Sequence, residues 1–281
     1  MASDLDLPSP PFLDIPGIAN FRDIGGYPSS SNGSSQSSVR RGLVFRSADP
    51  SKVLPEGLEK MKELGIKKVF DLRSIPEIKR DGPEWEGVEV DTNKFDSGIL
   101  RVWTPVFAGE DYSPEQIALR YKEYTRAGSE GFVKAYKDIL AAAPNAYRTI
   151  LLHLAQPSPE PCVVHCTAGK DRTGLLVALL YLLCDVPPEV IVKEYALTDL
   201  GLANLKPLFM ERLLKNPLLA GDETGTRRMT SSKPENMRAS LTMIEEVYGG
   251  AETYCRERLG FDDATLEQLR KNLTESTPPT L

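Results

Sequence analysis

The ten residues "HCTAGKDRTG", from His165 to Gly174, place a thiol, basic side chains and a carboxylate between two apolar runs. A strand, a short loop and a buried helix leave the backbone N–H groups of the loop and of the helix start unpaired, so the loop attracts anions. Beside the guanidinium of Arg172, Cys166 is expected to be a thiolate at neutral pH and therefore a nucleophile. The amides and Arg172 would hold the oxygens of a phosphoryl group in line with the sulfur. The pattern predicts phosphoryl transfer to cysteine.

A nucleotide-binding loop is the first alternative for this stretch, because Gly169 and Lys170 stand side by side. The pattern G-x-x-x-x-G-K-[ST] would require glycine at position 164 and serine or threonine at position 171. The chain has Val164 and Asp171 there. Two defining positions fail, which excludes this type of loop.

The order His-Cys, five residues, Arg, then Ser or Thr resembles the signature of the protein tyrosine phosphatase superfamily, with His165, Cys166, Arg172 and Thr173 at the defining positions. The blocks "GIANFRDIGGY", "RRGLVFRSADPS", "VFDLRSIPEI" and "VIVKEYALTD" resemble the bacterial and fungal atypical branch. The resemblance covers residues 15–272. It implies a cysteine-phosphatase fold, a phosphocysteine intermediate, and neither metal nor other cofactor. Loops of the form HC-x-x-GKDR are associated in that branch with activity on phosphoinositides as well as phosphotyrosine.

The resemblance also implies roles for the other loop residues. Thr167, Ala168 and Gly169 would contribute phosphate-binding amides, and His165 would orient the loop through hydrogen bonds rather than act as a base. The hydroxyl of Thr173 would help the sulfur leave in the second step. The alternative for Thr173 is a helix residue without consequence.

The general acid does not follow from the signature. Many members of the superfamily carry it on a separate Trp-Pro-Asp loop, whereas this chain has Trp103-Thr104-Pro105 and no aspartate until Asp111. Asp171 is the better candidate, as the acid that protonates the leaving oxygen and later activates water. The alternative is a structural carboxylate that pairs with Lys170 or Arg172. Asp96 and Asp111 are then next in line.

Five charged residues are assigned weaker roles. Lys170 is predicted to add positive field for substrates with several phosphates, the alternative being a surface charge. Asp71 and Arg73 end a strand that should lie parallel to the strand before Cys166, so they are expected at the same edge of the sheet, where ligands bind α/β proteins. Arg22 and Arg46 are expected to support the site, with a structural ion pair equally plausible for each.

Hydrophobic periodicity predicts one α/β domain over residues 15–273, with a central, mainly parallel sheet flanked by helices and a helical C-terminal half. Residues 42–47, 66–74 and 161–166 read as strands, and residues 87–92 as a further one; residues 55–65 and 173–184 read as helices. Residues 1–14 and 274–281 are expected to be disordered tails. The polar stretch 222–237 is expected to be a connection between helices, or a mobile lid.

Composition limits the remaining possibilities. The 281 residues carry a net charge of −6, which argues against a broad nucleic-acid or membrane-binding face. The longest apolar run, residues 175–184, is far shorter than the roughly 18 residues of a transmembrane helix. Four cysteines without a Cys-x-x-Cys pair indicate neither zinc nor disulfides. We therefore expect a cytoplasmic protein; its oligomeric state does not follow from the sequence.

The leading hypothesis is hydrolysis of phosphate monoesters through a Cys166 phosphoenzyme, acting on a phosphorylated protein or a phosphoinositide. Three alternatives stay open at this point. They are a pseudophosphatase that binds phosphorylated partners without turnover, an inositol-phosphate phosphatase, and a sulfur-transfer or thiol-redox protein. The last explains neither Arg172-Thr173 nor the additional sequence blocks.

Overall fold

The computed structural model describes residues 7–29, 37–79, 98–107 and 114–276. Its central sheet has five strands in the order β1 (Arg22–Asp23), β4 (Val44–Ser47), β7 (Cys162–His165), β5 (Lys68–Asp71) and β6 (Leu100–Trp103). Strands β4, β7, β5 and β6 run parallel, and β1 pairs antiparallel with β4. A second, antiparallel sheet contains β2 (Pro28–Ser29), β3 (Ser37–Val39) and β8 (Thr274–Ser276). The predicted α/β architecture with a mainly parallel sheet is confirmed.

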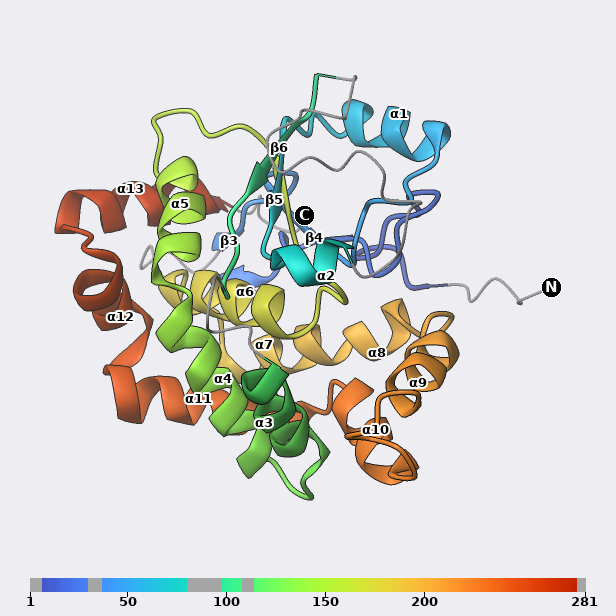
Figure 1. The fold of residues 1–281 in the computed structure, drawn as a ribbon. Helices are drawn as coiled ribbons and strands as arrows, with labels where there is room; N and C mark the ends of the chain where they lie inside the picture. The colour runs from blue at the N-terminus through green and yellow to red at the C-terminus, as the bar shows by residue number, and fades with distance from the viewer. Residues whose placement is uncertain (1–6, 30–36, 80–97, 108–113, 277–281) are drawn as a thin grey trace.

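Helices flank the central sheet and make up most of the chain after β6 (Figure 1). The first six helices along the chain, up to the one that follows β7, are α1 (Pro55–Glu63), α2 (Ile75–Lys79), α3 (Pro114–Thr125), α4 (Glu130–Ala142), α5 (Pro144–Leu154) and α6 (Asp171–Leu183). The C-terminal half continues with α7 (Pro188–Ala196), α8 (Thr198–Gly201), α9 (Lys206–Leu214), α10 (Glu223–Thr230), α11 (Pro234–Tyr248), α12 (Gly250–Leu259) and α13 (Asp263–Leu273). None of the helices in these described ranges has the length and apolar character needed to span a membrane.

The central strands separate two hydrophobic cores, because successive side chains of a strand point to opposite faces of the sheet. Phe70 and Val164 belong to the larger core, together with apolar residues of α4, α5 and α6. Their neighbours Val69 and Val163 belong to the smaller core, which includes Met61 of α1. Both faces of the sheet are therefore covered, as a parallel sheet requires.

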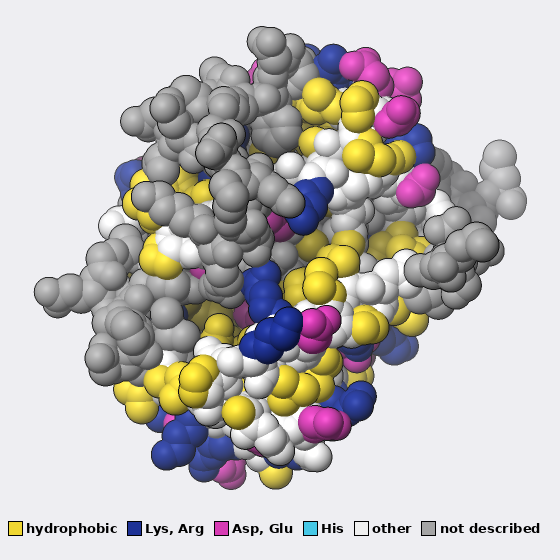
Figure 2. All heavy atoms as spheres, turned by 45° about the vertical axis from the view of Figure 1, so that its right-hand side comes forward, with side chains coloured by type: hydrophobic (Ala, Val, Ile, Leu, Met, Phe, Trp, Pro, Cys, Tyr) yellow, Lys and Arg dark blue, Asp and Glu magenta, His cyan; other side chains and the backbone are white. Residues whose placement is uncertain are grey.

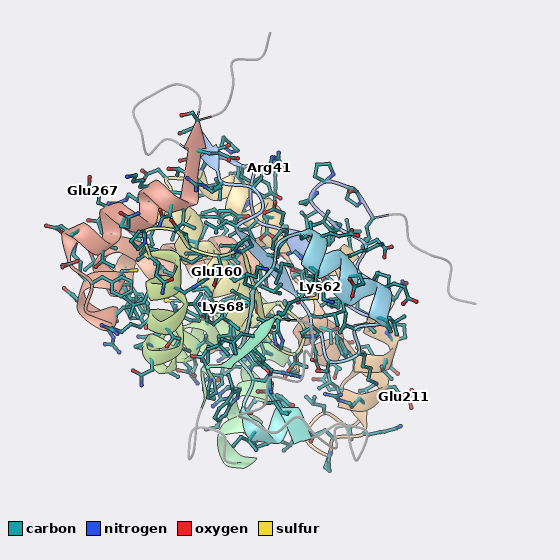
Figure 3. The ribbon with its side chains drawn as sticks, turned by 90° about the horizontal axis from the view of Figure 1, so that it is seen from above. Arg41, Lys62, Lys68, Glu160, Glu211 and Glu267 are labelled. Carbon is teal, nitrogen blue, oxygen red and sulfur yellow. The ribbon has the colours of Figure 1, made fainter. Side chains whose placement is uncertain are left out.

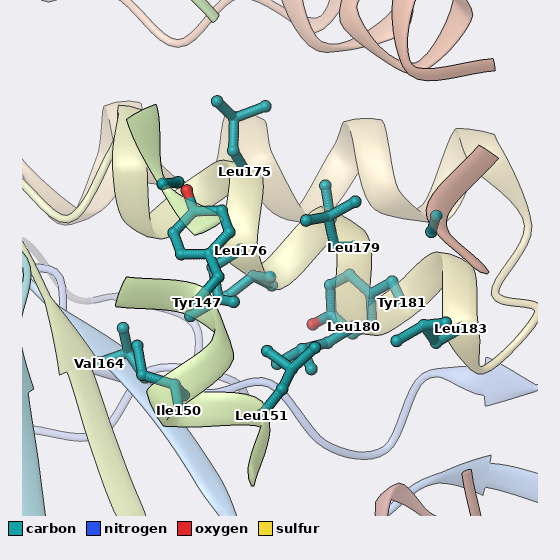
Figure 4. Packing of buried hydrophobic residues seen from close by; sticks show 14 of the residues in the cluster. Tyr147, Ile150, Leu151, Val164, Leu175, Leu176, Leu179, Leu180, Tyr181 and Leu183 are labelled. Carbon is teal, nitrogen blue, oxygen red and sulfur yellow. The ribbon is translucent and has the colours of Figure 1, made fainter. Parts of the chain in front are cut away.

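Helix α6 is buried on nearly all sides, which agrees with its apolar sequence. Leu176 lies on the side of α6 that faces Tyr147, Ile150 and Leu151 of α5, with Val164 of β7 close by, whereas Leu175 and Leu179 point to the other side of the helix (Figure 4). Burying a leucine side chain contributes about 2 kcal/mol relative to leaving it exposed. This packing fixes α6, and hence the loop that precedes it, against the sheet.

The strand register brings the candidate site to one edge of the sheet. Ser47 and Asp71 are both aligned with His165, so the C-terminal ends of β4, β5 and β7 lie together. The connection from β7 to α6 lies at this edge. The predicted position of Asp71 beside the end of β7 is thereby confirmed. At the opposite end of β5, Lys68 and Glu160 form an ion pair at 3.7 Å (Figure 3).

Ordered structure extends beyond the limits expected for the domain. Phe12 is buried and bridges Arg22, although residues 1–14 were expected to form a tail. Residues 274–276 form β8, which pairs with β3, although the tail was expected to begin at residue 274. Burial of Phe12 and Thr274 accounts for both extensions. Residues 1–6 and 277–281 lie outside the described residues.

The stretch 222–237 is not the loop that its polar composition indicates, because residues 223–230 form α10 and residues from 234 onward form α11. Glycine and threonine are weak helix formers, so propensity alone does not reveal α10. The Asp222 side chain caps it by accepting a hydrogen bond from the Gly225 N–H, and α10 packs against α3 and α9. The strand expected at residues 87–92 lies outside the described residues.

The packing of α6 predicts the cost of opening a cavity there. Leu179→Ala should lower the free energy of unfolding by about 3 kcal/mol, because the side chain is fully buried in the larger core. Chemical denaturation of both proteins measures the difference. Leu208→Ala is the control, since Leu208 is 57% exposed and its truncation should cost less than about 0.5 kcal/mol. Equal losses for the two variants would contradict this description of the core.

Candidate active site

The loop between β7 and α6 presents a row of backbone donors. Cys166 follows β7 directly and is 2% exposed, and α6 begins at Asp171. The N–H groups of residues 167–171 have no hydrogen-bond partner among the described residues. They lie at the N-terminal end of α6, where the helix dipole adds partial positive charge. The loop can therefore bind an oxyanion beside the Cys166 thiol.

Gly169 is required in this loop for two reasons. Its φ of +65° lies in the left-handed region, which L residues with side chains rarely adopt. In addition, a Cβ at this position would lie 2.1 Å from the carbonyl oxygen of Ser47. The loop thus packs directly on the end of β4, and a larger residue at position 169 would displace it.

Arg172 points to the same pocket and is held by a carboxylate that the sequence patterns did not reveal. Its Nη1 and Nη2 atoms lie 2.7 and 2.6 Å from the two carboxylate oxygens of Glu77, on α2. Glu77 also accepts hydrogen bonds from the N–H and hydroxyl of Ser74 and from the Thr167 hydroxyl. Burial alone would raise the pKa of Glu77, but Arg172 and these donors lower it to about 2. The spacing Ser74-x-x-Glu77 is a capping-box pattern and could have identified this residue.

Asp171 lies at the rim of the pocket, in contact with a buried pair of tyrosines. The Tyr136 hydroxyl lies 2.7 Å from Asp171 Oδ1 and 2.6 Å from the Tyr195 hydroxyl. Burial raises the pKa of Tyr136 and of Tyr195 well above the usual value, so Tyr136 is a neutral donor to the carboxylate. Lys170 Nζ lies 3.5 Å from the same oxygen. The carboxylate is therefore fixed through Oδ1.

Lys170 is buried, and its ammonium faces the end of α10. It donates hydrogen bonds to the carbonyl oxygens of Met229 and Ser231, the latter at 3.2 Å. The rings of Tyr124 and Phe132 lie within cation–π distance of Nζ, at 5.7 and 5.1 Å. Lys170 is thus not a solvated surface charge, and it ties the loop to α10. The predicted preference for substrates with several phosphates stays a prediction.

His165, Asp71 and Arg73 form a buried cluster behind the loop rather than part of its pocket. The Nδ1 atom of His165 lies 3.2 Å from the Cys166 carbonyl oxygen, and Nε2 lies 3.6 Å from Asp71 Oδ1. Burial lowers the pKa of His165. Burial alone would raise the pKa of Asp71, but His165 and the guanidinium groups of Arg73 and Arg101 hold it well below its usual range. The cluster supports the end of β7.

Arg22 and Arg46 form a second buried cluster, on the other side of the loop. Both bind Glu194 of α7, at 2.6 and 2.7 Å. The Arg46 Nη2 atom also donates to the Gly169 carbonyl at 2.6 Å, whereas Arg22 has its other hydrogen bonds with Asn20, Thr198 and the Glu194 backbone. Only Arg46 of this pair contacts the loop.

Thr173 stands in the first turn of α6 and is fully buried. Its hydroxyl has no hydrogen-bond partner among the described residues, although a buried hydroxyl normally has one. The role expected for Thr173, a hydrogen bond toward the sulfur, is compatible with this unpaired hydroxyl and stays a prediction.

The pocket above Cys166 is closed on its far side by helices that the sequence patterns did not assign to the site. Side chains of α3, α9 and α10 line it, namely Arg120, Tyr121, Tyr124, Phe209, Arg212, Leu213, Met229 and Thr230. Figure 1 shows α9 next to α10 at the edge of the helical layer. On the side of the molecule seen in Figure 2, a few Lys and Arg side chains gather near the middle, next to hydrophobic and acidic ones. With Lys170 and Arg172 beside Cys166 and aromatic and aliphatic side chains from the helices, the lining of the pocket is basic at its base and partly apolar along its walls.

The chain is similar in sequence to known phosphatases. The model of the tyrosine phosphatase family matches residues 13–275. The triple specificity protein phosphatase PtpB of Mycobacterium tuberculosis is 27% identical over 288 residues, which cover 92% of this chain and 97% of that protein. The tyrosine-protein phosphatase of Nostoc commune is 26% identical over 153 residues, or 51% of this chain and 49% of its own. The structure of P. aeruginosa TpbA in complex with pTyr covers 72% of this chain and 86% of its own, with 12% identity and a TM-score of 0.25.

The chain belongs to the tyrosine phosphatase family, because the family model covers nearly all of it. The resemblance inferred from the His-Cys to Arg-Thr signature is therefore confirmed. With the described pocket, this membership defines the protein as a phosphatase of the cysteine-dependent class.

The pKa of Glu77 predicts a pH dependence of stability. The folded pKa of about 2 lies below the ordinary value of 4.5, so the pair with Arg172 stabilises the fold above about pH 4.5 and loses this contribution as the pH falls toward 2. The full contribution is about 3 kcal/mol. Urea denaturation measures the free energy of unfolding of wild type and of Glu77→Gln at pH 6 and at pH 3. The difference between the two proteins should be larger at pH 6. Glu59→Gln in α1 controls for the loss of a carboxylate. A difference that does not change with pH would contradict this assignment.

Proposed function

We propose that this protein hydrolyses phosphate monoesters through a phosphocysteine intermediate at Cys166, acting in the cytoplasm on phosphotyrosine. The observation that supports this most directly is the row of N–H groups at residues 167–171, beside the Cys166 thiol, for which the described part of the chain provides no acceptor. Donors held in this way, with Arg172 among the pocket residues, can stabilise the oxygens of a phosphoryl group during transfer.

In the first step, the Cys166 thiolate attacks phosphorus, the S–P bond forms, and the P–O bond to the leaving group breaks. Asp171 transfers a proton to the leaving oxygen. Because Tyr136 occupies Oδ1, the proton is delivered from Oδ2. In the second step, Asp171 takes a proton from water, the water oxygen attacks phosphorus, and the S–P bond breaks. The Thr173 hydroxyl donates to the sulfur as the thiolate leaves, and inorganic phosphate is released.

The pocket walls support an aromatic phosphate ester as the substrate. Phe107, Tyr121, Tyr124 and Phe209 line the pocket together with Ile139 and Leu213, so a phenyl ring would find apolar partners above the loop. One relative is named a triple specificity protein phosphatase and another a tyrosine-protein phosphatase. Both names support phosphotyrosine as a substrate. A phosphorylated protein is therefore the first partner to test.

Phosphoinositides are the second candidate, and a specific observation favours them. Arg120 and Arg212 line the same pocket in addition to Lys170 and Arg172. Further phosphate groups on an inositol ring would meet these guanidinium groups, which bind phosphate oxygens in pairs. Soluble inositol phosphates share this chemistry, so the substrate panel must contain both.

Substitution of the nucleophile tests the reaction. Cys166→Ser should abolish phosphate release, to less than about one thousandth of the wild-type rate, because the hydroxyl is a far weaker nucleophile than a thiolate. The assay measures phosphate released from phosphotyrosine and phosphoserine peptides, from mono- and polyphosphorylated phosphoinositides, and from soluble inositol phosphates. Cys255→Ser changes a buried thiol outside the pocket and should stay active. Binding of phosphopeptide by wild type without release would instead indicate a pseudophosphatase.

Substitution of Asp171 tests the acid. Asp171→Asn should lower the rate of hydrolysis of alkyl phosphates by about a hundredfold or more. The rate on p-nitrophenyl phosphate should fall much less, because its good leaving group needs little protonation. Steady-state rates on the two ester types provide the comparison, with Asp263→Asn on the exposed side of α13 as the control. If Asp171→Asn turns over alkyl phosphates as fast as wild type does, the acid is another residue. Asp96 and Asp111, which lie outside the described residues, would then be tested.

A further inference from the structure

Three successive carbonyl oxygens of the phosphate loop accept hydrogen bonds from three residues that lie in two segments earlier in the sequence. The Thr167 carbonyl accepts from the N–H of Asp49 at 3.2 Å, the Ala168 carbonyl from Asn20 Nδ2 at 3.0 Å, and the Gly169 carbonyl from Arg46 Nη2 at 2.6 Å. Asn20 and Arg46 are buried. Neither of them lines the pocket above Cys166.

These bonds determine where the amides point. A peptide bond is planar and trans, so the carbonyl of one residue and the N–H of the next point in opposite directions. When Asn20 and Arg46 hold the carbonyls of Ala168 and Gly169 on one side, the N–H groups of Gly169 and Lys170 must turn to the other side. That side is the pocket, because Ala168 and Lys170 line it.

Arg46 is itself fixed by an ion cluster with an excess of positive charge. Glu194 binds both Arg46 and Arg22, and all three are fully or almost fully buried. Burial, with the neighbouring Arg46, lowers the pKa of Arg22 to about 10, so Arg22 remains protonated at neutral pH. Burial alone would raise the pKa of Glu194, but Arg22 and Arg46 lower it, so the carboxylate stays ionised. Two guanidinium groups thus face one carboxylate beneath the loop, which favours a bound anion above it.

Asn20 completes the same arrangement. Its Oδ1 accepts a hydrogen bond from Arg22 Nη1, while its Nδ2 binds the Ala168 carbonyl. Its φ of +58° is in the left-handed region, which asparagine tolerates better than most residues. The side-chain amide thus links the cluster to the loop, with its oxygen as acceptor and its nitrogen as donor.

We propose that Asn20 and Arg46 are positioning residues of the phosphate loop, and that Glu194 is the carboxylate that holds Arg46 in place. They act through the amides of Gly169 and Lys170 rather than by contact with the substrate. This inference rests on the proposed function, in which those amides bind the phosphoryl oxygens. Asn20 and Arg46 stand in the segments "NFRDIGG" and "VFRSADPS" of this chain.

The experiment compares Asn20→Gly with Asn272→Gly, and adds Arg46→Lys. Glycine at position 20 retains the left-handed backbone and introduces no charge. Asn272 is a matched control, since it is buried and its Nδ2 donates to the carbonyls of Leu154 and Gln156, outside the pocket. Arg46→Lys retains the positive charge but cannot bridge Glu194 and Gly169 as the planar guanidinium does. Tungstate serves as the phosphate-like probe.

Asn20→Gly and Arg46→Lys should each weaken tungstate binding by about tenfold or more, measured by titration calorimetry, because the inward amides lose their fixed direction. Their melting temperatures should fall no further than that of Asn272→Gly, which should bind tungstate as wild type does. Wild-type affinity in both folded variants would overturn the proposal. So would failure of both variants to fold while Asn272→Gly folds, because the residues would then serve stability alone.

If wild type neither binds tungstate nor releases phosphate from any substrate, the proposed function is wrong and the role of Asn20 and Arg46 falls with it. If wild type does both, and the two variants retain its affinity, only the positioning role is wrong.

Discussion

The site depends on backbone N–H groups that are kept away from any protein partner. Five consecutive amides, at residues 167–171, lie between a buried strand and a buried helix without an acceptor among the described residues. Unpaired buried donors cost free energy, so the surrounding structure must hold them in place. The packing of α6 and the bonds to the loop carbonyls do so, and a bound phosphoryl group would supply the missing acceptors. The need to hold these amides for an anion also explains why charged residues stand in the buried connection between β7 and α6.

Charge is distributed around this loop in separate buried clusters rather than in one. Glu77 holds Arg172 at the pocket, Asp71 binds arginines behind His165, and Glu194 binds two arginines beneath the loop. Buried ion pairs of this kind are weak evidence for stability but can fix a unique geometry. Glu77 orients a cation that lines the pocket, and Glu194 orients one that binds the Gly169 carbonyl of the loop, whereas the arginines bound by Asp71 lie behind His165. Positive charge is therefore concentrated at the site, although the chain as a whole carries a net charge of −6.

The sequence alone was sufficient to predict those helices and strands that local hydrophobic patterns specify. The strand before Cys166, the apolar helix after it and the strand ending at Asp71 follow from hydrophobic runs, and their common edge follows from the crossover rule. Contacts between distant segments could not be predicted in this way. Glu194 is separated by 148 residues from Arg46, and Glu77 by 95 from Arg172, so no local spacing links them. Helix α10 was missed for a related reason, since its low propensity is offset by contacts with α3 and α9.

In the proposed reaction, Cys166 carries the phosphoryl group during turnover. The most direct measurement is rapid quenching of the Asp171→Asn variant in acid during turnover of p-nitrophenyl phosphate, followed by mass spectrometry of the peptide that contains Cys166. This variant should accumulate the intermediate, because the carboxylate that activates water is missing. One phosphoryl group is expected on Cys166, and none in the Cys166→Ser variant. Phosphate release at a measurable rate without phosphorylation of Cys166 at any time point would contradict it.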